Sequence, residues 1–289
     1  NGDYTKRRIM FTQDFKEQPY WWDRSAPPKE QDTELPKRVD VLIIGAGYTG
    51  LHAAIQTARG SRNTLVIDAK HAGWGCSTRN GGQVSTSIKP SFFELEKTYG
   101  KDMAFAIYKE GDNSLQFTGD FIKQENLDCS YAEVGCFHAA HNTAQYEKLA
   151  RAIEHQASEL QDNAYMIPRS EQRSELGTDT YFGGAIFPKH ASIDPAAYHK
   201  GLLGKAHEAG ANIISYCAAE NINRDKNGFT VKTSKGIVQA DKVIIATNGY
   251  TGSLTPELQR RVIPIGSYVI ATEPVGKDLM DQLMPKNRI

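Results

Sequence analysis

Three glycines stand at the spacing G-x-G-x-x-G in the segment GAGYTG, at Gly45, Gly47 and Gly50. In dinucleotide-binding folds the first glycine allows a tight turn, the second lets a pyrophosphate approach the backbone, and the third lets the next helix pack on the preceding strand. The first turn of that helix offers free N–H groups and the positive end of its dipole to phosphate oxygens. Asp68 follows Gly50 by 18 residues, near the spacing of about 20 at which an acidic side chain binds ribose hydroxyls. The segment therefore predicts a site for an ADP-containing dinucleotide.

The elements that must position this turn lie on both sides of it. Residues 39–44 form an almost continuous apolar run, which is typical of a strand buried on both faces of a parallel sheet. Residues 48–60 carry a helical pattern that ends at Gly60, and residues 63–70 contain a second buried strand. A strand, a glycine turn, a helix and a second strand within about 30 residues predict a βαβ unit.

A glycine-rich stretch follows the second strand. Residues 71–85, HAGWGCSTRNGGQVS, contain four glycines and show neither a helical nor a strand repeat of apolar residues. A backbone this rich in glycine turns sharply or lies close to another group. We refer to residues 71–85 as the glycine loop.

The remainder of the chain mixes helices and strands. A helical pattern over residues 90–127 has a break near Gly100. Helices are also predicted from about 143 to 160, with Asn142 as N-cap, and over 170–177, with Ser170 as N-cap. A further helix is predicted over 194–210, with Asp194 as N-cap and Pro195 in its first position. Strands are predicted around Gly135 and over residues 211–224, 228–234, 236–240, 241–250 and 261–274. Residues 1–37 are polar and proline-containing with an aromatic knot, PYWW, and predict an irregular N-terminal arm whose aromatic residues anchor it on an apolar patch.

Composition excludes several classes of protein. Lys and Arg together number 34 and so do Asp and Glu, so the formal net charge is zero, which argues against nucleic-acid binding by bulk phosphate neutralisation. Four scattered cysteines without a C-x-x-C pair are typical of free thiols in a reducing compartment rather than of disulfides or a metal site. We find no apolar run long enough to span a bilayer and no signal peptide. We therefore expect a cytoplasmic protein without a metal.

The order of these parts resembles the D-amino-acid oxidase-like family of FAD-dependent oxidoreductases, and within it the γ-glutamylputrescine oxidase type. The matching segments are IIGAGYTGLHAA, IDAKHAGWGCSTRNGGQVS, ASIDPAAYHKGLLGKAHEAGANI, VIIATNGYT and PIGSYVIATEP. The resemblance implies an α/β fold: a Rossmann-like FAD-binding domain, with a parallel sheet and a β-meander, interleaved with an α+β substrate domain. We expect the FAD-binding domain over residues 38–90 and 188–255. Helical and substrate-domain segments are expected over 91–187 and 256–289, with the family's later part missing at the C-terminus.

The resemblance also assigns cofactor-binding residues. Residues 75–77 would bring backbone N–H groups to the pyrophosphate, and residues 79–83 would run beside the ribityl chain and under the flavin ring. Residue 219 would contact adenine through its backbone, and residues 247–249 would close over the dinucleotide. The expected FAD-binding residues are Gly45, Ala46, Gly47, Tyr48, Thr49, Gly50, Asp68, Ala69, Lys70, Gly75, Cys76, Ser77, Arg79, Asn80, Gly81, Gly82, Gln83, Ala219, Thr247, Asn248 and Gly249.

Alternatives remain open at two of these positions, and His52 nearby also needs an interpretation. Arg79 could instead form a surface salt bridge. Cys76, where relatives more often carry alanine, could be a reactive thiol or a covalent flavin tether, but a small buried thiol is the favoured interpretation. His52 is interpreted as a packed or surface residue. No catalytic base is assigned.

The resemblance implies the oxidation of a primary or secondary amine, γ-glutamylputrescine-like or an amino acid. A hydride would pass to flavin N5, the imine would hydrolyse, and O2 would be reduced to H2O2. Three alternatives stay open: a flavin dehydrogenase that passes electrons to a quinone or carrier protein, a non-catalytic dinucleotide-binding fragment, and a nicotinamide dehydrogenase.

Overall fold

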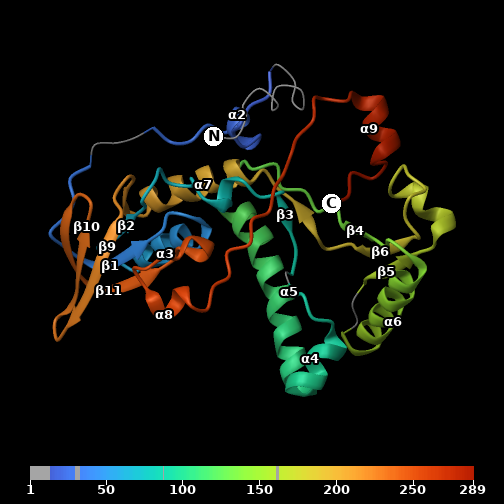
Figure 1. Ribbon diagram of the computed structural model, residues 1–289, viewed down its shortest axis with the longest axis horizontal. Helices are drawn as coiled ribbons and strands as arrows, with labels where there is room; N and C mark the ends of the chain where they lie inside the picture. The colour runs from blue at the N-terminus through green and yellow to red at the C-terminus, as the bar shows by residue number, and fades with distance from the viewer. Residues whose placement is uncertain (1–13, 30–32, 87, 161–162) are drawn as a thin grey trace, which may run out of the picture.

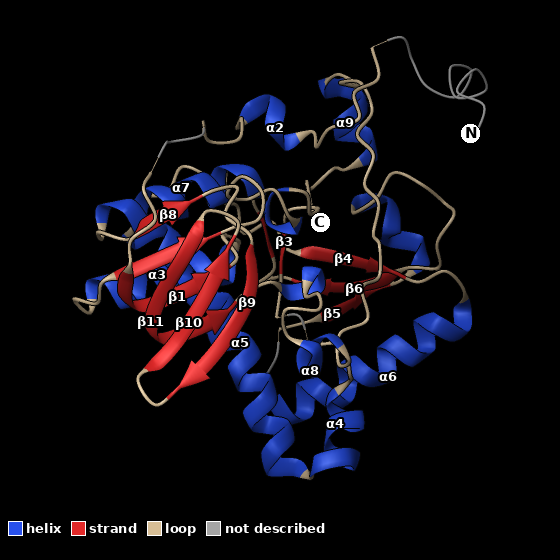
Figure 2. Ribbon diagram, turned by 60° about the vertical axis from the view of Figure 1, so that its left-hand side comes forward, coloured by secondary structure: helices blue, strands red, loops and turns tan. Residues whose placement is uncertain are grey.

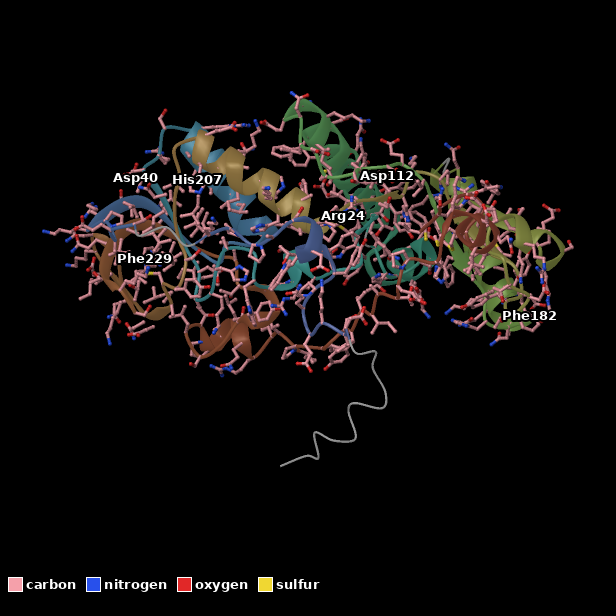
Figure 3. All side chains as sticks on the ribbon, turned by 90° about the horizontal axis from the view of Figure 1, so that it is seen from above. Arg24, Asp40, Asp112, Phe182, His207 and Phe229 are labelled. Carbon is pink, nitrogen blue, oxygen red and sulfur yellow. The ribbon has the colours of Figure 1, made fainter. Side chains whose placement is uncertain are left out.

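The computed structural model describes residues 14–29, 33–86, 88–160 and 163–289. A six-stranded sheet with α3 and α7 lies at one end of the molecule, and a three-stranded sheet with α6 lies at the other (Figure 1). Helix α5 runs between them. Seen from above, Phe229 of the large sheet and Phe182 beside the small sheet lie toward opposite ends, with Asp112 of α5 between them (Figure 3).

The large sheet has the strand order β8-β2-β1-β11-β10-β9. Its parallel part consists of β1 (Arg38–Ile44), β2 (Thr64–Ile67), β8 (Asn212–Ile214) and β11 (Gly236–Ile245). Helix α3 (Tyr48–Arg59) connects β1 to β2. The predicted βαβ unit is therefore confirmed, because β1 and β2 pair in parallel with Leu42 opposite Leu65.

A β-meander completes this sheet (Figure 2). Strands β9 (Ala219–Asp225), β10 (Gly228–Thr233) and β11 pair antiparallel in succession. The prediction of one strand over 211–224 is wrong: the chain leaves β8, and Tyr216 adopts a positive φ of 53°. The prediction of two strands over 236–250 is also wrong. β11 is one strand, since its first half pairs with β10 and its second half continues beside β1.

Two apolar cores cover the two faces of the large sheet. The first lies between the sheet and helices α3, α7 (Pro195–Glu208) and the end of α5 (Lys101–Gln124). It includes Ile43, Leu51 and Leu202, which are fully buried. The second joins the parallel strands to the meander and includes Leu42, Ile67 and Val231. Burial on both faces explains the continuous apolar runs at residues 41–44 of β1 and 65–67 of β2.

The segments outside the large sheet form a pair of consecutive helices, α4 and α5, and a small sheet. Helix α4 (Phe92–Tyr99) meets α5 at Gly100, whose φ of 84° makes the predicted break. The small sheet has the order β4-β6-β5 and contains β4 (Cys136–Ala139), β5 (Tyr165–Ile167) and β6 (Gly184–Phe187). Helix α6 (Thr143–Leu160) begins behind Asn142, whose side chain accepts the Gln145 N–H at 2.8 Å, as predicted.

Two further predictions are corrected. The helix expected behind Ser170 is the 3₁₀ helix η2 (Arg169–Ser174), which begins one residue earlier and has no side-chain cap. Residues 261–274 contain no strand. They run between α8 (Pro256–Gln259) and α9 (Lys277–Leu283), and no strand of the described residues pairs with them. Tyr268 in this segment is 94% exposed.

All six strands of the large sheet come from residues 38–67 and 212–245. Both ranges lie inside those expected for an FAD-binding domain, although the domain boundaries stay a prediction. The N-terminal arm is described from residue 14, apart from residues 30–32, and contains α2 (Trp21–Arg24). The part of the predicted arm over residues 1–13 lies outside the described residues.

Candidate cofactor site

Three of the predicted segments meet where the parallel strands end. The glycine turn follows β1, Asp68 follows β2, and Ala246 follows β11. Backbone hydrogen bonds join them: the Gly45 N–H donates to the Ile67 carbonyl and the Ala246 N–H to the Ile44 carbonyl, both at 2.8 Å. Ligands of open parallel sheets bind at this carboxyl edge.

Each glycine of the turn lies where a side chain would not fit. Gly45 has a φ of 110°, and a Cβ there would lie 2.6 Å from the Ala246 carbonyl oxygen. A Cβ on Gly50 would lie 1.9 Å from the Gly45 carbonyl oxygen, and one on Gly47 would lie 2.9 Å from Ser77 Oγ. The turn therefore has the close approaches that a pyrophosphate-binding glycine motif requires.

Asp68 ties the turn to the end of β2. Its Oδ2 accepts the Ala46 N–H at 2.8 Å, and its Oδ1 accepts the Lys70 N–H at 2.9 Å. The half-buried carboxylate can still accept further hydrogen bonds, because an ionised carboxylate has about four lone-pair sites. Its position and remaining capacity fit the predicted role toward ribose hydroxyls. Ala69 beside it is exposed.

The N-terminus of α3 lies against the glycine loop. Ser77 Oγ accepts the Tyr48 N–H at 3.1 Å and thereby satisfies one of the free donors of the helix. Thr49 in the same turn is exposed. The Tyr48 side chain turns inward, donates its hydroxyl hydrogen to the Pro195 carbonyl at 2.9 Å, and packs on Tyr198. Burial raises the pKa of the Tyr48 hydroxyl.

The glycine loop is closed by one of its own side chains. Asn80 donates from Nδ2 to the carbonyls of Cys76 and Ser77, and its Oδ1 accepts the Gly82 N–H at 2.9 Å. Gly82 has a φ of 70°, and a Cβ there would lie 2.2 Å from the Ile193 carbonyl oxygen. Residues 76–82 therefore form a compact bend that includes the 3₁₀ helix η1 (Cys76–Thr78).

The N-terminal arm packs on this bend. Trp21 Nε1 donates to the Asn80 carbonyl and Trp22 Nε1 donates to Thr78 Oγ1, both at 2.9 Å. The sequence predicted an apolar anchor, whereas both indole N–H groups bind the glycine loop.

Arg79 is ordered by aromatic rings. Its guanidinium carbon lies 4.9 Å from the Trp22 ring centroid and 4.6 Å from that of Trp74, and its Nε donates to the Trp74 carbonyl at 2.7 Å. Among the described residues Arg79 has no carboxylate partner, so the salt-bridge alternative is not supported. Its predicted place beside the ribityl chain stays a prediction.

The expectation of a buried thiol at Cys76 is wrong, since Cys76 is exposed. It is the first residue of η1, a short helix at the surface of the loop, and the Asn248 side-chain nitrogen lies 3.8 Å from its sulfur.

The segment after β11 covers the glycine loop from the other side. It forms the 3₁₀ helix η3 (Asn248–Tyr250), and Thr247 Oγ1 lies 2.7 Å from Thr251 Oγ1. The Tyr250 ring lies against Gly75, where a Cβ would come within 2.9 Å of it. A Cβ on Gly249 would meet no atom within 4 Å, so this glycine borders open space.

Ala219, expected near adenine, is the first residue of β9 and pairs with Thr233 of β10. Two residues earlier, the Cys217 N–H donates to the Asp68 carbonyl at 2.8 Å. The backbone two residues before Ala219 is therefore hydrogen-bonded to Asp68, the residue that follows β2.

Gln83 connects the glycine loop with a cavity. Strand β3 (Gln83–Val84) pairs with β7 (Ala191–Ser192), and Gln83 lines a cavity of about 1560 Å³. The cavity lies between α4, α5, α6 and the small sheet. Its charged lining is mainly basic, with Glu94 and Asp112 as acidic residues and six basic ones: Lys89, Lys97, Lys109, Lys148, Arg151 and Lys189.

Sequence reasoning missed three side chains of the site: Trp74, Tyr250 and His199. His199 is 2% exposed, and its Nε2 lies 2.8 Å from the Ala46 carbonyl oxygen. Trp74 and Tyr250 could have been identified from the sequence, because each is an aromatic residue next to a glycine of a predicted cofactor segment. No local pattern links His199 to a turn 153 residues away.

Within the described ranges, no helix is long and apolar enough to cross a membrane. The same residues hold no group of three or more His, Cys, Asp or Glu side chains placed to share a metal ion.

The chain is similar to characterised and solved flavoenzymes. Gamma-glutamylputrescine oxidoreductase of Escherichia coli is 32% identical over 86% of this chain and 58% of that protein. A probable oxidoreductase OrdL of Rhizobium meliloti is 30% identical over 87% of this chain and 59% of that protein. The chain thus spans less than two thirds of the length of these relatives.

Solved structures show the same fold. Glycine oxidase from Geobacillus kaustophilus superposes with a TM-score of 0.64 at 18% identity, covering 77% of this chain and 59% of that one. L-amino acid deaminase from Proteus vulgaris gives a TM-score of 0.63 at 17% identity, covering 81% and 53%. The profile of the family described as DAO, FAD dependent oxidoreductase, matches residues 40–288. The chain therefore belongs to the DAO family of FAD-dependent oxidoreductases.

Proposed function

We propose that this protein oxidises a primary or secondary amine that carries a carboxylate, either γ-glutamylputrescine-like or an amino acid, with O2 as the electron acceptor. The names of its relatives support the reaction class, since they include gamma-glutamylputrescine oxidoreductase and glycine oxidase. The observation that carries the proposal is Gln83, because it both ends the bend expected beside the flavin and lines the large cavity. The substrate would bind in this cavity.

FAD would supply a two-electron acceptor for the hydride that leaves the amine-bearing carbon. The residues expected to hold it are the glycine turn, Asp68, the glycine loop and residues 247–249. Their work would be to orient the cofactor and to place backbone N–H groups against it before the reaction begins. Water would hydrolyse the resulting imine to an aldehyde or keto acid with release of ammonia or an amine. O2 would take up the two electrons removed from the substrate, together with two protons, as H2O2.

The charge of the cavity supports a carboxylate-bearing amine. Six basic and two acidic side chains line it. Two of the basic ones are paired: Lys189 with Asp112 at 3.2 Å, and Arg151 with Glu147 at 4.0 Å. The remaining basic excess attracts a carboxylate. It also lowers the pKa of a bound ammonium group, because like charges disfavour the charged form. Hydride loss requires the neutral amine, so both effects favour the reaction.

The test is anaerobic mixing of the FAD-loaded protein with γ-glutamylputrescine and, as a matched control, putrescine, which lacks the glutamyl carboxylate. We expect γ-glutamylputrescine to bleach the visible flavin absorption at much lower concentration than putrescine. Admission of O2 should restore the absorption and yield H2O2. Bleaching that only a quinone or carrier protein reverses would indicate a dehydrogenase instead. If neither an amine nor an amino acid bleaches bound FAD, the proposed reaction is wrong.

A further inference from the structure

We propose that His199 is a positioning residue for FAD, which acts on the pyrophosphate site through the Ala46 carbonyl. His199 lies on α7, outside both glycine segments, and is 2% exposed. The inference uses the family's cofactor but not the proposed substrate, so each can fail without the other.

His199 fixes one peptide of the glycine turn. Its Nε2 lies 2.8 Å from the Ala46 carbonyl oxygen, while the N–H of Ala46 donates to Asp68 Oδ2, also at 2.8 Å. Ala46 is therefore held at both its polar backbone atoms by buried or half-buried side chains. The peptide groups on either side of Ala46 therefore cannot rotate without breaking one of these two hydrogen bonds.

The direction of the Ala46 carbonyl determines the direction of the next N–H. The described chain contains no cis peptide. In a trans peptide the carbonyl of one residue and the N–H of the next lie in the same plane and point in opposite directions, as here for Ala46 and Gly47. Because the carbonyl points at His199, the Gly47 N–H points away from α7. Among the described residues this N–H has no hydrogen-bond acceptor. Gly47 is the glycine expected to meet the pyrophosphate, so His199 aims a free donor at that ligand.

His199 also contacts the start of the glycine loop. A Cβ on Gly73 would lie 2.6 Å from His199 Cε1, so the loop backbone passes directly against the imidazole ring. Gly73 has a φ of 79°. One side chain thus sets the spacing between the two segments expected on either side of the dinucleotide.

The protonation state is consistent with this role. Burial lowers the pKa of His199, with a smaller opposing effect from its bond to Ala46 and from nearby Asp68, and a further lowering by His71. The neutral ring must carry its hydrogen on Nε2, since the facing Ala46 carbonyl can only accept.

The experiment compares FAD and ADP affinity in variants of His199. His199→Phe keeps an aromatic ring but removes the donor, whereas His199→Gln retains an N–H at similar reach. We expect His199→Phe to raise the dissociation constants of FAD and of ADP about tenfold each, as the loss of one buried hydrogen bond implies. His199→Gln should stay close to the wild type, and the positions of the flavin absorption bands should not change in either variant.

Tyr198→Phe is the matched control, because it removes a hydrogen bond from the same helix, to His52 at 2.8 Å, and keeps the aromatic ring that packs on Tyr48. It should leave both affinities unchanged. If His199→Phe does not fold, His199→Asn takes its place, since its shorter amide cannot reach Ala46. Unchanged FAD and ADP affinity in the donor-free variant would overturn the proposal, and so would equal losses in the donor-free and Gln variants.

Discussion

Gly47 offers a way to separate what the fold requires from what the cofactor requires. Its φ of −86° and ψ of −171° are open to any residue, so alanine would introduce no backbone strain. Among the described residues, a Cβ there would approach only the Ser77 side chain, with Oγ at 2.9 Å and Cβ at 4.0 Å. Removing that hydroxyl should therefore make alanine acceptable to the fold.

The expected free energies follow from these contacts. Ser77→Ala alone loses the cap on the Tyr48 N–H and should cost about 1 kcal/mol of unfolding free energy. Gly47→Ala alone displaces the same hydroxyl and should cost a similar amount, reduced by about 0.4–1 kcal/mol because alanine restricts the unfolded chain. In the Ser77→Ala background the clash is gone, so Gly47→Ala should be neutral or slightly stabilising. The two changes should thus be non-additive.

FAD affinity should behave differently. The added methyl group still lies where the pyrophosphate is expected, so Gly47→Ala should weaken FAD at least about a hundredfold in both backgrounds, or ~2.7 kcal/mol. Urea unfolding of the cofactor-free protein gives the stabilities, and titration of FAD fluorescence gives the affinities. If FAD binding recovers in the double variant, the pyrophosphate does not lie against Gly47, and the proposed cofactor position is wrong.

Three other perturbations test parts of the structure away from that glycine. Glu175→Gln should cost about 3 kcal/mol in urea unfolding, because it leaves Arg288 and Lys286 without the fully buried carboxylate that they contact at 2.5 and 2.6 Å; an unchanged unfolding midpoint would contradict that pairing. Burial lowers the pKa of His52 below its ordinary value of 6.5, so the unfolded state binds more protons and stability should fall as pH drops below 6.5. His52→Phe should flatten that decline, and an equally steep decline in the variant would assign it to other groups. Trp21→Phe removes the indole N–H that binds the glycine loop, and hydrogen exchange of the loop amides should become faster while amides of β1 keep their rates; equal rates in the loop would show that the arm does not order it.

Local patterns predicted the parts of the site that depend on backbone chemistry. The spacing of Gly45, Gly47 and Gly50 and the position of Asp68 reflect contacts within one βαβ unit, so a short stretch of sequence contains them. The cap at Asp194 and the break at Gly100 are equally local. These predictions succeeded because each depends on a φ angle or on a neighbour a few residues away.

Contacts between distant segments were beyond local patterns. The end of β8 depends on a hydrogen bond from Tyr216 to Lys70, which follows another strand. The stacking of Arg79 requires the N-terminal arm, and the role of His199 requires α7 to pass behind the glycine turn. Residues 261–274 are rich in apolar and β-branched residues, as a strand is, but a strand also needs a partner for its backbone hydrogen bonds. Sequence pattern alone carries no information on whether that partner is present.

Both the proposed reaction and the proposed role of His199 require FAD to bind at the carboxyl edge of the large sheet. The most direct measurement is the visible absorption spectrum of the purified protein, taken before and after acid precipitation and again after incubation with added FAD. We expect a flavin spectrum of the folded protein, and acid should release the yellow colour into the supernatant. A protein that is colourless as purified and takes up no added FAD would contradict FAD binding at this edge.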